Sequence, residues 1–164
     1  MVAGAGAILY NRPPFILFLL GGQHIVPELR QRALTIGQAA LQKKATDVVI
    51  LDVEPLTSVA DYFIFCSGSS ERQVKAIADG IAQELVRCFS FRAIIEGGSS
   101  ATWILLDYGD IVVHVFRDDI RAFYGVENMW RDAEEIPQSE FDSLPTGSLP
   151  KRTITPPVVA HHAR

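Results

Sequence analysis

Apolar positions recur at helical spacing in two stretches of the chain. Between residues 29 and 44 they stand three or four apart, at Leu29, Ala33, Ile36 and Ala40. A second stripe with the same spacing follows Ser70 and runs to Cys88. Residues at these intervals share one face of a helix, so both stretches are predicted to be amphipathic helices. Ser70 and Gln73 also match a capping box, which predicts that the second helix begins there.

Five shorter apolar runs, rich in β-branched and aromatic residues, predict strands. They cover residues 47–53, 62–66, 91–96, 103–107 and 111–116. The link at 108–110 between the last two runs is short enough to favour an antiparallel hairpin. A last helix is expected from residue 118 or 119 to Trp130. Helices in this order around a small sheet predict an α/β fold with a mixed sheet of about five strands.

The composition changes at both ends of the chain. Residues 1–28 carry Gly, Ala and Pro without clear periodicity, and residues 135–164 are rich in Pro, Ser and Thr. We therefore expect a low-order extension at 1–28, one folded domain at 29–134 and a disordered tail at 135–164. The apolar run from Phe15 to Leu20 is too short to span a membrane. A simple extension is favoured over a signal peptide, because no small-x-small cleavage site follows that run.

Charge and cysteine usage narrow the classes of partner and site. The net charge is -4, whereas proteins that grip nucleic acid through its phosphates are usually basic, so a basic protein is the better-matched partner. Cys66 and Cys88 form no CxxC or Cys/His cluster, which argues against a zinc site. We expect two buried free thiols, as in the reducing cytoplasm.

The one motif that suggests phosphate chemistry is the turn Gly68-Ser69-Ser70 before the second helix. Nucleotidyltransferases hold a triphosphate at such a turn, but they also need paired carboxylates for magnesium, and no Asp-x-Asp follows here. Capping and strand–helix packing are the simpler explanation of the turn. His114 stands alone in a strand, with no nucleophile at a catalytic spacing. We therefore expect no catalysis, no cofactor and no metal, and a nucleotidyltransferase-like enzyme stays as the alternative.

Aromatic and acidic residues concentrate in the C-terminal half of the predicted domain. Tyr108 lies in the hairpin turn, where we expect its ring to be exposed. Tyr and Trp anchor many interfaces, and nearby carboxylates would suit a basic protein. A solvated charged rim over an aromatic core would give the same pattern. The residues concerned are Trp103, Asp107, Tyr108, Asp110, Asp118, Asp119, Phe123, Tyr124, Glu127 and Trp130.

Three blocks of the sequence together resemble the Iojap/RsfS family of ribosomal silencing factors. The first covers Asp61-Tyr62-Phe63-Ile64 and residues 67–79. The second begins at Glu96-Gly97 and continues through residues 103–116. The third comprises Arg121, Phe123-Tyr124 and residues 127–130. Each block is weak alone, but their order over residues 30–133 is specific.

The resemblance implies a nucleotidyltransferase-like α/β domain without the catalytic carboxylates, and a binding function. The implied partner is the large ribosomal subunit, through the subunit-interface protein that is fourteenth in the universal large-subunit set. The implied consequence is that the small subunit is sterically excluded and translation falls. A homodimer is compatible with this function, and neither nucleic-acid nor membrane binding is expected. The residues carried over as partner contacts are Trp103, Asp107, Tyr108, Asp110, His114, Arg121 and Tyr124.

One position departs from the family pattern. Gly125-Val126 follows Tyr124 where the family more often has a bulkier residue and a leucine. Glycine costs about 1 kcal/mol relative to alanine inside a helix, so we expect the last helix to be loosened at Gly125.

Overall fold

A mixed sheet forms the centre of the computed structural model, which describes residues 28–144. The sheet has six strands in the order β3-β4-β5-β2-β1-β6. Its central strands β2 and β5 run parallel, and every other neighbouring pair is antiparallel. The predicted α/β class with a mixed sheet is confirmed. The strands are β1 (Thr46–Asp52), β2 (Tyr62–Gly68), β3 (Ile94–Glu96), β4 (Trp103–Asp107), β5 (Ile111–Arg117) and β6 (Glu134–Glu135).

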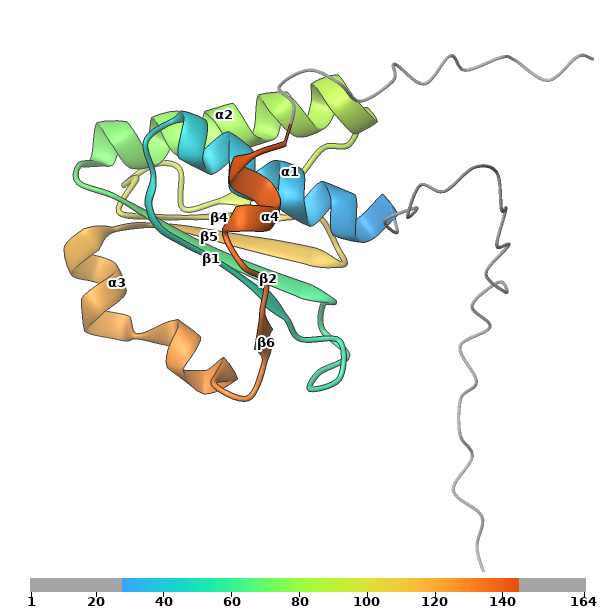
Figure 1. Ribbon diagram of the computed structural model, residues 1–164. Coiled ribbons are helices and arrows are strands. Elements are labelled where there is room, and N and C mark those ends of the chain that lie inside the picture. The colour runs from blue at the N-terminus through green and yellow to red at the C-terminus, as the bar shows by residue number, and fades with distance from the viewer. Residues whose placement is uncertain (1–27, 145–164) are drawn as a thin grey trace, which may run out of the picture.

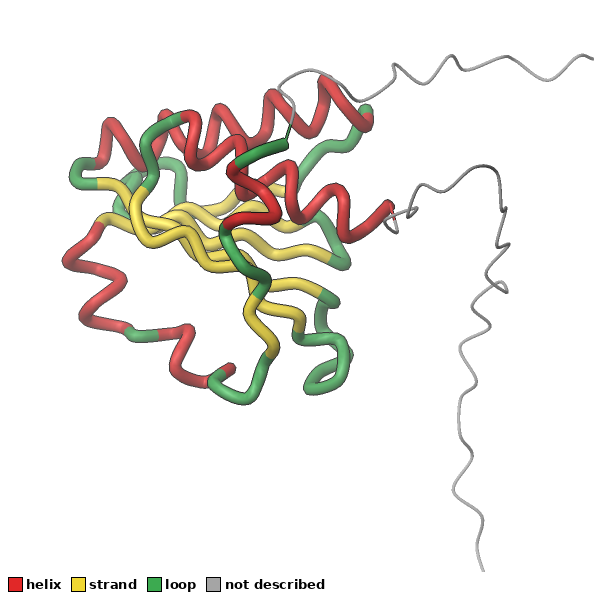
Figure 2. Tube along the Cα trace, in the orientation of Figure 1, coloured by secondary structure: helices red, strands yellow, loops and turns green. Residues whose placement is uncertain are grey.

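Two long helices cover one face of this sheet, as Figures 1 and 2 show. They are α1 (Glu28–Gln42) and α2 (Glu71–Phe89). Their apolar stripes bury Ile36, Ile77, Ile81 and Leu85 completely or nearly so. The larger hydrophobic core therefore lies between these helices and the sheet, where their amphipathic patterns predict it.

The start of α2 satisfies its free amides with its own side chains. The Ser70 hydroxyl accepts a hydrogen bond from the Gln73 amide at 3.2 Å, as the capping box predicts. The Gln73 side chain reaches back one residue further than expected, because its Oε1 accepts from the Ser69 amide at 2.9 Å. At the other end, Ser90 adopts a left-handed conformation with φ 55° and donates its amide to Val86.

The last predicted helix is divided in two. The α-helix α3 (Asp118–Tyr124) ends at Gly125, which adopts φ 52° and donates its amide to the Arg121 carbonyl. A 3-10 helix, η1 (Val126–Trp130), follows at once. Glycine enters the left-handed region without a steric penalty, so the chain turns at the position where loosening was expected.

The ordered chain extends beyond the boundary expected at residue 134. Residues 134–135 form β6, which pairs with the end of β1 at Asp52 and Leu51. A short helix, α4 (Ser139–Asp142), then inserts the fully buried Phe141 against α1. Residues 135–144 therefore differ from the disordered tail expected there, because they supply a sheet edge and a core side chain. The expected extension at 1–28 loses its last residue to α1, which begins at Glu28. Residues 1–27 of that extension and the rest of the expected tail lie outside the described residues.

The two cysteines occupy different environments. Cys66 is fully buried in β2, and burial raises the pKa of its thiol to about 12. Cys88 is only half-buried, so the expectation that it is buried was wrong. Its thiol donates to the Glu84 carboxylate on the preceding turn of α2. Within residues 28–144, no helix is both long and apolar enough to cross a membrane.

Candidate functional site

The face of the sheet opposite α1 and α2 is covered only in part. Figure 1 shows α3 on this side, below the strands, while α1, α2 and α4 lie above them. Apolar side chains from α3 and η1 cover Phe63, Phe65 and Phe116, which are buried. Because side chains alternate along a strand, this face also holds Trp103, Leu105 and Asp107 of β4. We call it the open face.

His114 is held on the open face by aromatic rings. Its imidazole is stacked on Phe65, with ring centroids 5.0 Å apart and planes 8° apart. Its Nδ1 accepts a hydrogen bond from the Trp103 indole at 3.2 Å, so the neutral ring carries its proton on Nε2. Burial lowers the pKa of His114 to about 4. His114 is therefore uncharged at neutral pH and acts as an acceptor that orients Trp103.

A series of rings leads from His114 out to solvent. Trp103 is half-buried and stacks on Phe116 with centroids 4.8 Å apart. Tyr124 follows, with its centroid 5.6 Å from that of Trp103, and Phe123 lies 5.0 Å beyond it. Tyr124 is 56% exposed and Phe123 is 80% exposed. We call Trp103, Phe123 and Tyr124 the aromatic ladder; its outer members are large rings in water.

The two acidic residues among the predicted partner contacts, Asp107 and Asp110, lie at the end of β4 and in the turn that follows it. Asp107 is half-buried on the open face, and its Oδ1 accepts from the Gly109 amide at 2.7 Å. Asp110 is exposed in the hairpin turn. Trp103 and Asp107 are the first and last residues of β4, so a rise of about 3.3 Å per residue puts their Cα atoms about 13 Å apart. The structure therefore brings Trp103, His114 and Tyr124 together and leaves Asp107 and Asp110 at a separate point of the same region.

Arg121 is buried and fully engaged inside the protein. Its Nη1 donates to the Asp47 carbonyl at 2.7 Å and to the Ser67 hydroxyl at 3.0 Å. Its Nε donates to the Glu127 carboxylate at 2.8 Å. Arg121 thus fastens α3 to β1 and β2 and holds η1 beside it. It positions the aromatic ladder rather than presenting a free charge to a partner.

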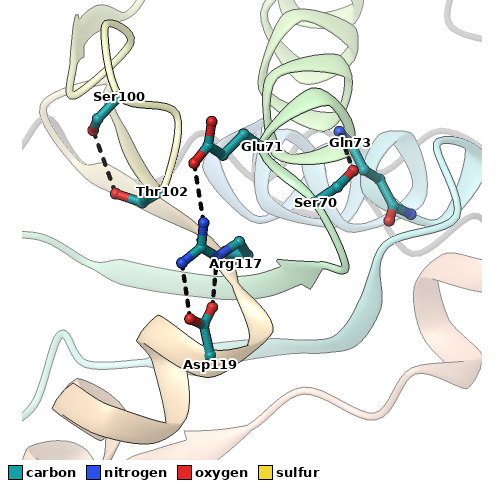
Figure 3. Close-up of polar contacts among 7 residues, drawn as sticks. All are labelled: Ser70, Glu71, Gln73, Ser100, Thr102, Arg117 and Asp119. Atoms are coloured by element: carbon teal, nitrogen blue, oxygen red, sulfur yellow. Dashed lines mark hydrogen bonds and ion pairs between the residues drawn. The ribbon is translucent and has the colours of Figure 1, made fainter.

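A second arginine, Arg117, joins the starts of two helices at the end of β5. Figure 3 shows its guanidinium between Glu71 and Asp119. Its Nη1 lies 3.0 Å from Glu71, and its Nε lies 2.7 Å from Asp119. These ion pairs draw α3 toward the N-terminus of α2. They are partly exposed, so each contributes little to stability by itself.

Tyr108 does not expose its ring. Although Tyr108 follows the strand into the turn, it is only 5% exposed and stacks on Phe91, with ring centroids 5.6 Å apart. Strand alternation places it with Ile104 and Leu106 on the helix-covered face, which is the physical reason that the expected exposure was wrong. Burial raises the pKa of its phenol to about 12.

The turn Gly68-Ser69-Ser70 is occupied by the protein's own groups. The Ser70 and Gln73 side chains accept hydrogen bonds from backbone amides at the start of α2. The Glu71 carboxylate lies in the first turn of this helix. A negative side chain at this place opposes the binding of a phosphate. Among residues 28–144, no group of three or more His, Cys, Asp or Glu side chains is placed to hold a metal ion.

Two exposed apolar side chains were not among the residues predicted as partner contacts. Phe123 is more exposed than Tyr124, and Met129 in η1 is 71% exposed. Both belong to segments that otherwise read as amphipathic helix, where apolar residues are expected to point inward. The signal that could have found Phe123 is its position beside Tyr124, since adjacent helical residues cannot both face the core.

A hollow beside Arg121 completes this end of the open face. Its lining includes the carboxylates of Asp47, Asp118 and Glu127, together with polar groups such as the Asn128 amide. Arg121 contributes the only basic side chain of that lining and is already paired with Glu127. The region next to the aromatic ladder is therefore net negative.

Comparisons with known proteins agree with one another. A family model described as ribosomal silencing factor during starvation matches residues 26–158. The ribosomal silencing factor RsfS of Bacillus subtilis is 44% identical over 101 residues, which cover 61% of this chain and 86% of that protein. A mouse protein named mitochondrial assembly of ribosomal large subunit protein 1 is 29% identical over 92 residues, covering 54% of this chain and 40% of the mouse protein. The crystal structure of a Chromobacterium violaceum protein is similar with a TM-score of 0.61 at 34% identity, covering 63% of this chain and 87% of that one.

Proposed function

The chain belongs to the family of ribosomal silencing factors, and from this we propose that it binds the large ribosomal subunit and represses translation. Membership supports a ribosome-associated role in silencing translation. The name of the mouse relative, which refers to assembly of the ribosomal large subunit, supports that subunit as the partner. The bacterial relative is named as a silencing factor rather than an enzyme, which favours binding over catalysis.

We place the docking site on the aromatic ladder, and the exposure of its outer rings is the observation that carries the proposal. Phe123 and Tyr124 keep large rings in water on a sheet face that α1 and α2 leave uncovered. Rings of this size bury much area at little entropic cost when a partner covers them. Trp103, oriented by His114, extends the same surface toward the core.

The charge beside the ladder suits a basic ribosomal protein. Asp47, Asp118 and Glu127 surround the hollow next to α3, and Asp107 and Asp110 lie further along the open face. Complementary charge accelerates encounter and fixes the orientation of a partner. We propose that the partner is the fourteenth protein of the universal large-subunit set, at the face that joins the small subunit. A factor bound there in the cytoplasm would exclude the small subunit by its bulk.

Co-sedimentation tests this function directly. The protein is expected to migrate with isolated large subunits and to be missing from joined ribosomes. Adding it to separated subunits should reduce the amount that joins when magnesium is raised. Equal occupancy of large subunits and joined ribosomes, or binding to neither, contradicts the proposal.

Variants of the outer rings test the placement of the site. Phe123→Ala and Tyr124→Ala should each weaken binding to the large subunit by roughly tenfold or more, as expected for interface anchors. Val59→Ala is the matched control, because Val59 is 70% exposed but lies outside the ladder. If Phe123→Ala and Tyr124→Ala bind the large subunit as tightly as Val59→Ala, the docking site does not lie on the ladder.

A further inference from the structure

The outer edge of β3 is exposed and apolar. This strand lies at one end of the sheet, so no strand within residues 28–144 pairs with its free side. Ile94 is 69% exposed and Ile95 is 51% exposed, although they point to opposite faces of the sheet. Proteins usually protect such an edge with proline, a bulge or a covering segment, because it can pair with another chain.

The hydrogen-bonding pattern of the neighbouring strands shows which peptide groups β3 presents. The Tyr108 amide donates to Ile111 and the Arg117 amide donates to Thr102, so the even-numbered residues of β4 bond to β5. Its odd-numbered residues therefore face β3. Since Ile94 is opposite Asp107 and Glu96 is opposite Leu105, those two residues of β3 bond inward. The peptide groups of Ala93 and Ile95 consequently point out of the sheet.

Two opposite charges flank this edge at equal distances from Ile94. Arg92 and Glu96 are both exposed, and neither makes an ion pair or side-chain hydrogen bond within the described part of the chain. Arg92 lies two residues before β3. Its neighbours Phe91 and Ala93 pack against the core beneath the helices, so Arg92 points to the open face, which it shares with Ile94 and Glu96. Along this edge Arg92, Ile94 and Glu96 follow one another on one face. When two such edges run antiparallel, each arginine is opposite a glutamate of the other edge.

We propose that β3 pairs with β3 of a second copy of this chain, antiparallel, with the two Ile94 residues facing each other on the twofold axis. In this register Ala93 is opposite the second copy's Ile95, so the outward peptide groups of both copies bond across the contact. Arg92 is opposite Glu96 twice, at positions where side chains approach most closely. Centring the axis on Ile95 instead would place Ile94 against Glu96 and leave both Arg92 side chains without a partner.

This arrangement has a defined consequence for the molecule. Cross-strand neighbours share a face, so the two sheets would join into one, with both open faces on the same side and both aromatic ladders free. The paired segment is short, and the contact therefore fits a weak dimer that forms at high concentration. The inference does not depend on the proposed ribosomal function.

Charge-reversal variants test this register. Sedimentation velocity at low salt, over protein concentrations from micromolar to millimolar, measures how strongly each variant dimerises. Wild type should show a monomer–dimer equilibrium. Arg92→Glu or Glu96→Arg alone sets like charges against each other at two points, and each should weaken the dimer at least tenfold. The double variant Arg92→Glu/Glu96→Arg restores opposite charges and should return to within about threefold of wild type. A monomer throughout the range, or a double variant as weak as the single ones, overturns the proposal.

Cysteine cross-linking gives an independent readout. In a Cys88→Ser background, Ile94→Cys places two thiols at a facing pair whose Cα atoms are about 4.5 Å apart, within disulfide range. Glu96→Cys, equally exposed, separates the thiols by about 13 Å in this register. Mild oxidation should link the first variant into covalent dimers and leave the second monomeric. Equal cross-linking of both variants, or of neither, contradicts the proposed contact.

Discussion

At the scale of single residues, His114 shows how burial controls charge beneath the aromatic ladder. Its pKa falls to about 4 because the ring is removed from water, whereas an unfolded chain would protonate it near 6.5. Between about pH 6.5 and pH 4, His114 is protonated in the unfolded state but stays neutral in the folded state. The free energy of unfolding should therefore decline across that interval, by roughly 3 kcal/mol at the most from this residue.

His114→Phe separates this contribution from the other titrating groups. The phenyl ring keeps the stack on Phe65 but cannot be protonated. Between pH 6.5 and pH 4, the free energy of unfolding measured in urea should decline less steeply for the variant than for wild type. At neutral pH the variant should be less stable by about 1 kcal/mol, because the Trp103 indole loses its acceptor. Identical pH slopes would show that the pKa of His114 is the same in the folded and unfolded protein, which contradicts a pKa lowered by burial.

Tyr108 offers a second test at this scale. Its hydroxyl is buried and finds no hydrogen-bond partner among the described residues. A buried polar group without a partner is costly, so Tyr108→Phe should raise the free energy of unfolding by about 1 kcal/mol. Tyr62→Phe is the control, since the hydroxyl of that buried tyrosine interacts with Arg30 and its loss should destabilise. Weaker subunit binding by Tyr108→Phe at unchanged stability would restore Tyr108 as a contact residue.

At the scale of elements, the turn between α3 and η1 sets the direction of the aromatic ladder. Gly125 adopts φ 52°, a conformation that a side chain disfavours, and an added Cβ would lie 2.6 Å from the side-chain nitrogen Nδ2 of Asn128. Gly125→Ala should therefore cost about 1 kcal/mol of stability and weaken subunit binding together with it. Gly98→Ala is the matched control, because Gly98 has open space around its Cα and no positive φ.

An unchanged midpoint for Gly125→Ala in urea would contradict this role of the turn. Loss of stability without loss of binding would show that α3 keeps its direction by other means. Arg121 is the evident candidate, since it fastens α3 to Asp47 and Ser67.

The elements that could be predicted are those whose own side chains carry the pattern. The stripe after Ser70 and its cap predicted α2, and apolar runs rich in β-branched and aromatic residues predicted β4 and β5. β6 could not be predicted, because two adjacent glutamates have little strand preference and pair only because β1 offers a free edge. The burial of Arg121 likewise depends on a carbonyl and a hydroxyl distant in sequence, which no local pattern contains.

At the scale of the whole molecule, two faces and one edge of the sheet have different roles. One face packs on α1 and α2 and supplies most of the core. The open face carries the ladder, and the β3 edge carries the proposed self-contact. Tyr108 illustrates how this division limits residue-level prediction: the family resemblance placed it among the contacts, but its position in the alternation assigned it to the core.

This separation predicts that docking and self-association can be lost independently. Phe123→Ala combined with Tyr124→Ala should abolish co-sedimentation with large subunits and leave the concentration dependence of dimer formation unchanged. Arg92→Glu should do the reverse, since Arg92 lies at the β3 edge and not on the ladder. If ladder variants also remove the dimer, self-association uses the aromatic surface and competes with the ribosome. If Arg92→Glu also weakens docking while the fold stays intact, the partner reaches across β4 to the sheet edge, and its footprint covers the whole open face.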